Sequence, residues 1–210
     1  MIDKSFLRYA SLAIFLTLTG CAGQGGLFGV GEFEIIETDN RFNPTGESLI
    51  ISKNNRISTK SIAGGVHIDS NGVYVNPSVT KSKDGGEISV SLLIVNHTSH
   101  DTAFGSPNVL GKPERISFLI DNGKLIELKI FDAEHEWADT RYYNSGTRSV
   151  YTQIMESGVA PLTKSQYREI MQAKNLVVKL VGTKRSVTYE ASEISQSFQE
   201  NLSLFYQNNM

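Results

Sequence analysis

Two histidines and an aspartate follow an apolar run closely, at His97, His100 and Asp101. Imidazole and carboxylate groups are ligands for zinc and iron. A working site needs a further ligand fixed from elsewhere, and His67 and His135 are the only other histidines. The same residue types are typical of a polar loop, where they satisfy turn hydrogen bonds. We expect a solvated loop just past a strand, and we keep as the alternative a metal-assisted hydrolase that uses His97, His100 and Asp101.

The segment 132–146 concentrates aromatic and acidic side chains. It holds the only tryptophan, Trp137, the adjacent pair Tyr142 and Tyr143, and four carboxylates. Aromatic faces beside hydrogen-bonding groups can bind a sugar or a peptide chain. We expect an irregular loop here, with Trp137, Tyr142 and Tyr143 as candidates for binding a partner or ligand.

Other catalytic patterns are absent from the sequence. It contains no Gly-x-Ser-x-Gly motif, which would indicate a serine nucleophile. The Gly-rich stretch 22–31 is not followed by the Gly-Lys-Ser/Thr of a phosphate-binding loop. We therefore expect a protein that is not an enzyme, with no catalytic residue and no cofactor.

The N-terminus has the layout of a secretory signal, with a basic start, an apolar core and small residues before a cysteine. The uncharged run 10–18 is about half the ~20 residues that cross a bilayer as a helix. The motif Leu18-Thr19-Gly20-Cys21 resembles the lipobox of bacterial lipoproteins. The likeness covers a tenth of the chain, but it is specific, because the charged head, the apolar core, the small residues and the terminal cysteine follow each other in the expected order.

This resemblance implies that Cys21, the only cysteine, is the lipid attachment site and that residues 1–20 are removed. Two or more acyl chains hold a protein stably at a membrane. In such lipoproteins the next residue helps to choose the membrane. Here it is Ala22 rather than the aspartate linked to inner-membrane retention. The resemblance therefore implies an anchor in the outer membrane, facing the periplasm.

Charge and length limit the remaining possibilities. The chain has 20 Lys and Arg and 22 Asp and Glu. Loss of residues 1–20 removes Lys4, Arg8 and Asp3. The remaining chain has 18 basic and 21 acidic side chains, a net charge of −3. This balance, without a basic run, argues against nucleic acid as a partner. We expect a signal over 1–20, a lipidated and Gly-rich tether over 21–32, and one globular domain over 33–210.

The first two thirds of that domain show strand signals. Apolar residues alternate or cluster in short runs over 33–36, 48–51, 66–70, 73–76, 88–95 and 147–155. Asn71-Gly72 predicts a two-residue hairpin that places Ile68 opposite Val75. The run 88–95 ends apolar on both faces, which predicts a central strand. A lobe boundary, if there is one, lies near 111–113.

A second hairpin is predicted around residues 121–123. A three-residue loop with Gly123 in the left-handed conformation sets Phe118 opposite Ile126. A two-residue loop would mix apolar and charged side chains on one face.

The last third predicts helix, hairpin, helix. Thr163 and Gln166 form a capping box before a helix over 164–174. A hairpin then sets Leu180 opposite Val187, and a final helix is expected to begin at Ser192. Its apolar stripe consists of Ile194, Phe198, Leu202 and Phe205. The order predicts an α+β fold, a mainly antiparallel and sandwich-like sheet with two short helices in the C-terminal third.

These expectations combine into a membrane-anchored envelope lipoprotein. Its role is non-catalytic, binding or structural, toward a protein, peptidoglycan or lipid partner. An accessory that holds an apolar ligand between sheet and helices remains a further alternative.

Overall fold

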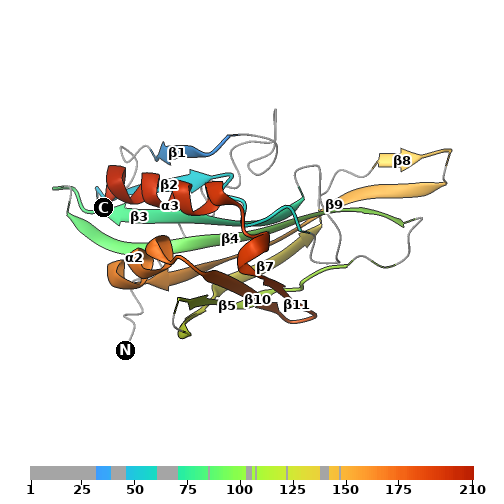
Figure 1. Cartoon of the computed structure of the whole chain (residues 1–210). Helices are drawn as coiled ribbons and strands as arrows, with labels where there is room; N and C mark the ends of the chain where they lie inside the picture. Colours follow the sequence, from blue (N-terminus) through green and yellow to red (C-terminus); the bar gives the residue numbers. More distant parts are fainter. Residues whose placement is uncertain are drawn as a thin grey trace.

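The computed structural model of the chain describes residues 32–38, 46–60, 71–84, 86–102, 106, 108–121, 123–137, 142–146 and 148–210 (Figure 1). The elements, in chain order, are β1 Glu34–Glu37, β2 Ser48–Lys53, β3 Gly72–Lys81, β4 Glu87–Asp101, β5 Pro113–Ile120, β6 Lys124–Lys129, β7 Phe131–Trp137, β8 Tyr142–Asn144, β9 Ser149–Leu162, α2 Lys164–Gln172, β10 Leu176–Gly182, β11 Ser186–Tyr189, the 3₁₀ helix η3 Ala191–Glu193 and α3 Gln196–Asn209. The expected signal and most of the tether lie outside the described residues. No described helix is long and apolar enough to cross a membrane.

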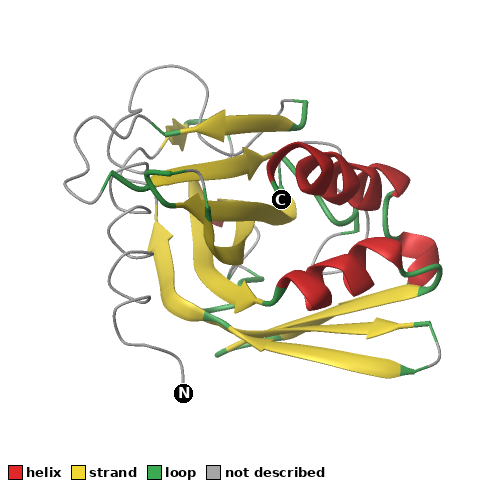
Figure 2. Ribbon diagram, turned by 90° about the vertical axis from the view of Figure 1, so that its left-hand side faces the viewer, coloured by secondary structure: helices red, strands yellow, loops and turns green. Residues whose placement is uncertain are grey.

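The strands form two antiparallel sheets. The larger has the order β1-β2-β3-β4-β9-β7, with β8 also paired to β9, and the smaller has the order β11-β10-β5-β6. Helices α2 and α3 lie next to each other between the two sheets, on one side of the molecule (Figure 2). The predicted α+β class, mainly antiparallel with two helices in the C-terminal third, is confirmed.

The apolar core lies between the sheets and the helices. Ile94, Phe118, Val178 and Phe198 are all 0% exposed and belong to one cluster. These residues come from both sides of the possible lobe boundary at 111–113, so strands before and after that position share one core.

The central position of β4 is confirmed, although the strand is longer than expected. It pairs with β3 on one side and β9 on the other. Leu92 and Ile94 face the main core, whereas Leu93 and Val95 belong to a small apolar cluster on the opposite face. Both faces are buried, as the uninterrupted apolar run indicated.

The first predicted hairpin is wrong. Its expected first strand, 66–70, lies outside the described residues, but both edges of its second strand are taken. Val75 pairs with Ile94 on one side, and its N–H donates to Asn55 O at 2.9 Å on the other. Gly72 pairs with His97, so the Asn-Gly dipeptide begins a strand instead of forming a turn.

The second hairpin has the predicted register, with Phe118 opposite Ile126. Gly123 has φ +85°, the left-handed conformation that the three-residue loop requires. The pairing of Leu180 with Val187 in the β10–β11 hairpin is confirmed as well.

Both helices form, and one begins later than expected. The Thr163 and Gln166 capping box at α2 is present. Ile194 and Ser195 have extended backbones, so the chain breaks after η3 and α3 begins at Gln196 instead of Ser192. The Ser195 N–H donates to Ile57 O at 2.9 Å, which holds the extended segment.

Candidate functional site

The His97–Asp101 segment is part of strand β4, so the expected loop is wrong. The register with β9 runs without interruption to Asp101 opposite Tyr151. His97 and His100 are each only 9% exposed. Strand pairing, rather than turn hydrogen bonding, therefore determines where these side chains lie.

The strand separates the two histidines. Successive side chains in a strand point to opposite faces, so residues three apart project away from each other. His100 lies on the inner face with Trp137, and His97 lies on the outer face. The described residues contain no group of three His, Cys, Asp or Glu side chains that could hold a metal. A metal site built on both histidines has no geometric support.

The segment 132–146 is also more regular than expected. Strands β7 and β8 both pair with β9, and residues 138–141 between them lie outside the description. The sequence carries a signal for β7, because Ala133, His135 and Trp137 alternate with Glu134 and Glu136. The alternation is weak as a sequence signal, because a histidine and two glutamates make the run polar at three of its five positions.

These strands build a projecting end of the large sheet, which we call the sheet end. It consists of residues 96–101 of β4, 149–156 of β9, the last residues of β7, and β8. Figure 1 shows that β8 and the first half of β9 reach beyond the smaller sheet and the helices. At Gly158, a Cβ atom would lie 2.4 Å from the side chain of Ile130, the residue that links β6 to β7, so this link packs closely against β9 next to the sheet end.

Trp137, on the edge strand β7, is the largest exposed side chain on the inner face of the sheet end. It is 42% exposed and pairs across the strands with Ile154, which is 0% exposed. Its ring has edge contacts with His100 (centroids 6.5 Å apart, 83° between planes) and with His135 (6.4 Å, 84°). Perpendicular contacts of this kind are favourable between aromatic rings. They orient the indole while leaving much of it in solvent.

Two exposed tyrosines accompany Trp137. Tyr143 is 66% exposed and pairs with Val150, which places it on the same face as Trp137. The paired residues on β9 are four positions apart, about 13 Å along the strand. Tyr151, 37% exposed, lies on the opposite face. Tyr142 has its backbone in β8, and its side chain lies outside the description.

Glu156 is a fully buried carboxylate at the base of the sheet end, and sequence reasoning missed it. One oxygen accepts from Asn96 Nδ2 at 2.8 Å and from the Leu110 N–H at 2.9 Å. The other accepts from the Gly111 N–H at 2.5 Å and lies 2.8 Å from His135 Nδ1. A carboxylate oxygen accepts, so the His135 tautomer that makes this hydrogen bond is the one with its hydrogen on Nδ1.

The backbone N–H groups that donate to Glu156 come from a segment that is itself fixed by hydrogen bonds to the small sheet. Leu110 O accepts from the Lys184 and Arg185 N–H groups in the β10–β11 turn, at 3.0 and 3.2 Å. Gly111 has φ +79°, and a Cβ there would lie 2.3 Å from Thr183 Oγ1. Glu156 of the large sheet thus binds the segment Leu110–Gly111, and the same segment is hydrogen-bonded to the β10–β11 turn of the small sheet. Four occupied acceptor positions make Glu156 a structural group rather than a reactive one.

The edge strand β7 carries closely spaced negative charges. Partial burial raises the pKa of Glu134 above its ordinary value, and repulsion from Glu136 and Asp132 raises it further. Lys112 offsets part of this effect. An anionic ligand is therefore disfavoured along this edge of the sheet end.

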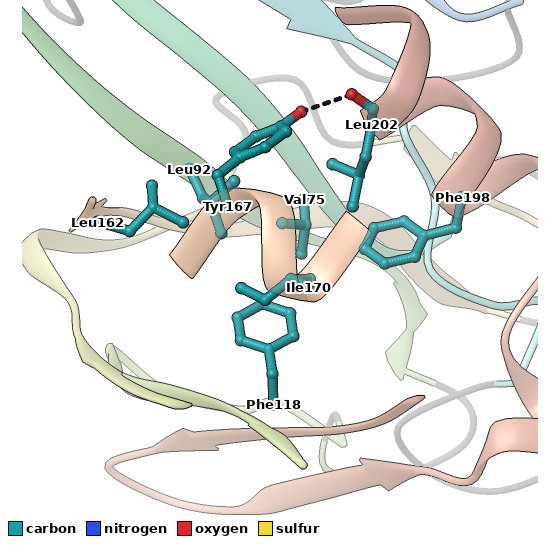
Figure 3. A pocket seen from close by; sticks show the side chains of 8 residues that line it. All are labelled: Val75, Leu92, Phe118, Leu162, Tyr167, Ile170, Phe198 and Leu202. Atoms are coloured by element: carbon teal, nitrogen blue, oxygen red, sulfur yellow. Dashed lines mark hydrogen bonds between the residues drawn. The ribbon is translucent and has the colours of Figure 1, made fainter. Parts of the chain in front are cut away.

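An apolar space lies between the helices and the sheets (Figure 3). It has about 200 Å³ with its opening included, and no part of it is wide enough for a water molecule. The Tyr167 hydroxyl donates to Leu202 O at 2.9 Å and joins the two helices across it. Burial raises the pKa of Tyr167, which keeps its hydroxyl a donor. An apolar ligand would enter only if the helices moved apart.

Comparison with protein-family models, with curated proteins and with solved structures finds no match to this chain. The proposal below therefore rests on the residues themselves. Cys21, the lipid attachment site implied by the lipobox, lies outside the described residues.

Proposed function

We propose that this protein is an outer-membrane lipoprotein that faces the periplasm and binds the glycan strands of peptidoglycan through the sheet end, without catalysing a reaction. The anchor is supported by the signal and the Leu18-Thr19-Gly20-Cys21 motif. The binding role is carried by one observation. Trp137 remains 42% exposed although two histidine rings hold it in place.

Exposed aromatic rings at a projecting end favour a binding role. Leaving an indole and two phenol rings in water forgoes the free energy of burying them. Packing against His100 and His135 orients Trp137 before a ligand arrives, so less freedom is lost on binding. Loop tips with mobile aromatics would lack this advantage.

A sugar chain fits this surface better than the other envelope partners. Each ring of a glycan has an apolar face for stacking and hydroxyl or amide groups at its rim. Trp137 and Tyr143 offer two platforms on one face, and the imidazoles of His100 and His135 lie beside the first. Glu134 and Glu136 alternate with Trp137 on β7 and lie on its opposite face, where their charge disfavours an anionic lipid surface.

The enzymatic alternative finds less support. A metal-assisted hydrolase would need His97 and His100 to point to one site, and their strand turns them to opposite faces. Glu156, the only described carboxylate that is fully buried, is occupied by donors from the fold.

Co-sedimentation with purified peptidoglycan tests the binding role. We expect the intact acylated protein, in detergent solution, to sediment with the glycan. Trp137→Ala should weaken binding about tenfold or more, the loss expected for a central aromatic contact. Leu204→Ala is the matched control, since Leu204 is 45% exposed on α3. Equal sedimentation of the Trp137 variant and the wild type would contradict the proposal.

The anchor has a separate test. Cys21→Ser should leave the protein unprocessed or release it from the membrane fraction, because the acylated sulfur is lost. Intact-mass measurement of the wild-type protein should show acyl mass on a chain that begins at Cys21. A mature form without acyl mass would refute the anchor and leave the peptidoglycan test unaffected.

A further inference from the structure

We infer that the outer face of the small sheet, centred on Leu119 and Leu125, rests on the anionic lipid surface of the membrane that holds the protein. The inference builds on the proposed lipid anchor and assigns a second contact to the same membrane. It concerns a different surface from the sheet end.

Three apolar side chains lie next to each other on this face. Leu119 of β5 pairs with Val177 of β10 on one side and with Leu125 of β6 on the other. Leu119 is 43% exposed, Leu125 is 58% exposed and Val177 is partly exposed. Their neighbours Phe118 and Ile126 point inward and are buried. Scattered exposed leucines need no explanation, but a cross-strand row at a hairpin tip forms a continuous apolar strip.

Basic side chains follow the apolar strip along the same strands. Lys179, Arg115 and Lys129 are exposed on this face, and Glu127 is its only carboxylate in the described strands. The Arg115 to Glu127 ion pair is long, at 3.5 Å, and both side chains are about half exposed. The face therefore carries a net charge of +2, opposite in sign to the −2 of the whole chain. Apolar residues flanked by Lys and Arg are typical of protein surfaces that rest on anionic lipids.

Because the lipid anchor already keeps the protein at the membrane, a weak contact is sufficient to hold this face of the small sheet against the lipid surface. Eleven residues separate Cys21 from Phe33, and the twelve steps between their Cα atoms span at most about 43 Å. The folded part is thus confined close to the bilayer, which raises its effective concentration there. The small sheet forms one outer layer of the molecule, so its outer face is open to such a contact (Figure 2).

A spin label reports which surroundings Leu125 has. The intact acylated protein carries Leu125→Cys, or Leu204→Cys on α3 as the control, because the only native cysteine is the acylated one. Each labelled protein is placed in vesicles of phosphatidylcholine and phosphatidylglycerol. Collisions with oxygen, which concentrates in bilayers, are compared with collisions with a water-soluble nickel chelate. We expect the label at 125 to collide several-fold less with nickel and more with oxygen than the label at 204.

Two results would overturn the inference. The label at 125 could be as accessible to nickel as the label at 204, or it could be shielded from both reagents, which would indicate a second copy or another protein on this face. Vesicle flotation distinguishes a failed anchor, because an unacylated protein would not float and would take up label at Cys21. In that case the label at 125 is measured in a protein that also carries Cys21→Ser and is added to the same vesicles. The absence of oxygen enrichment at 125 overturns the inference. Lys129→Gln with Lys179→Gln should reduce the protection at 125, because the double variant removes two of the three basic side chains on this face.

Discussion

His135 Nδ1 lies 2.8 Å from Glu156 Oε1, and this pair joins the edge strand β7 to the buried base of the sheet end. The same carboxylate holds the Leu110 and Gly111 N–H groups, so the position of Trp137, two residues from His135, is linked to the contact between the sheets. The candidate binding surface is therefore supported by the core of the fold and not by a loop.

Removing the Glu156 side chain should destabilise the protein strongly. Glu156→Ala leaves two buried backbone N–H groups without their acceptor and leaves Asn96 Nδ2 with only its longer bond to Thr98 Oγ1, at 3.3 Å. We expect a loss of about 3–5 kcal/mol in the free energy of unfolding. Denaturant unfolding followed by circular dichroism measures it. Glu134→Gln on β7 is the control and should cost little, because burial and repulsion already disfavour that charge. Equal stability of the two variants would show that the buried carboxylate is dispensable.

The C-terminal helix should behave as part of the core. Phe198 is 0% exposed, and truncation of a buried Phe to Ala costs about 3–5 kcal/mol. That is a large share of the ~5–15 kcal/mol that stabilises a typical domain. We expect Phe198→Ala to lower the melting temperature by many degrees and Leu204→Ala, on the exposed side of α3, to leave it nearly unchanged. A melting temperature for Phe198→Ala near that of the wild type would mean that the helix packs elsewhere in solution.

Acid should weaken one contact between η3 and the chain after β2. A hydrogen bond from Lys60 Nζ, at 2.8 Å, lowers the pKa of Glu193 below its ordinary value of 4.5, and the Glu190 N–H lowers it further. Because the folded-state pKa is the lower one, the charged carboxylate stabilises the fold above pH 4.5, and this contribution is lost as the pH falls through the lowered pKa.

The measurement is thermal unfolding from about pH 7 to about pH 2. We expect Glu193→Gln to be less stable than the wild type at neutral pH and equal to it at the acid end. A constant difference over the whole range would show that the carboxylate charge is not responsible.

Elements that depend on neighbours in the sequence could be predicted. The β5–β6 register follows from matching apolar faces across a loop of three residues, and the α2 cap follows from a motif of four. Phe198 was expected in the core because its helical stripe is visible in the sequence.

Elements whose partners are distant could not be predicted in the same way. His97 and His100 looked like loop residues because nothing nearby shows that β9, more than fifty positions later, extends β4 to Asp101. The Asn71-Gly72 dipeptide favours a turn locally, but the pairing of Val75 with Ile94 and Asn55 overrides that preference. Glu156 gives no signal, since its donors come from three other segments of the chain.

The central claim is that Trp137 contacts a glycan, and the fluorescence of this single tryptophan tests it most directly. The intact protein is titrated with soluble peptidoglycan fragments produced by enzymatic digestion. We predict a saturable shift of the emission to shorter wavelength as a sugar ring covers the 42% exposed indole, and a reduced affinity in Tyr143→Ala because that variant loses the second platform. Saturable binding of the fragments, detected by calorimetry, without any change in tryptophan emission would contradict the account, as would the absence of binding.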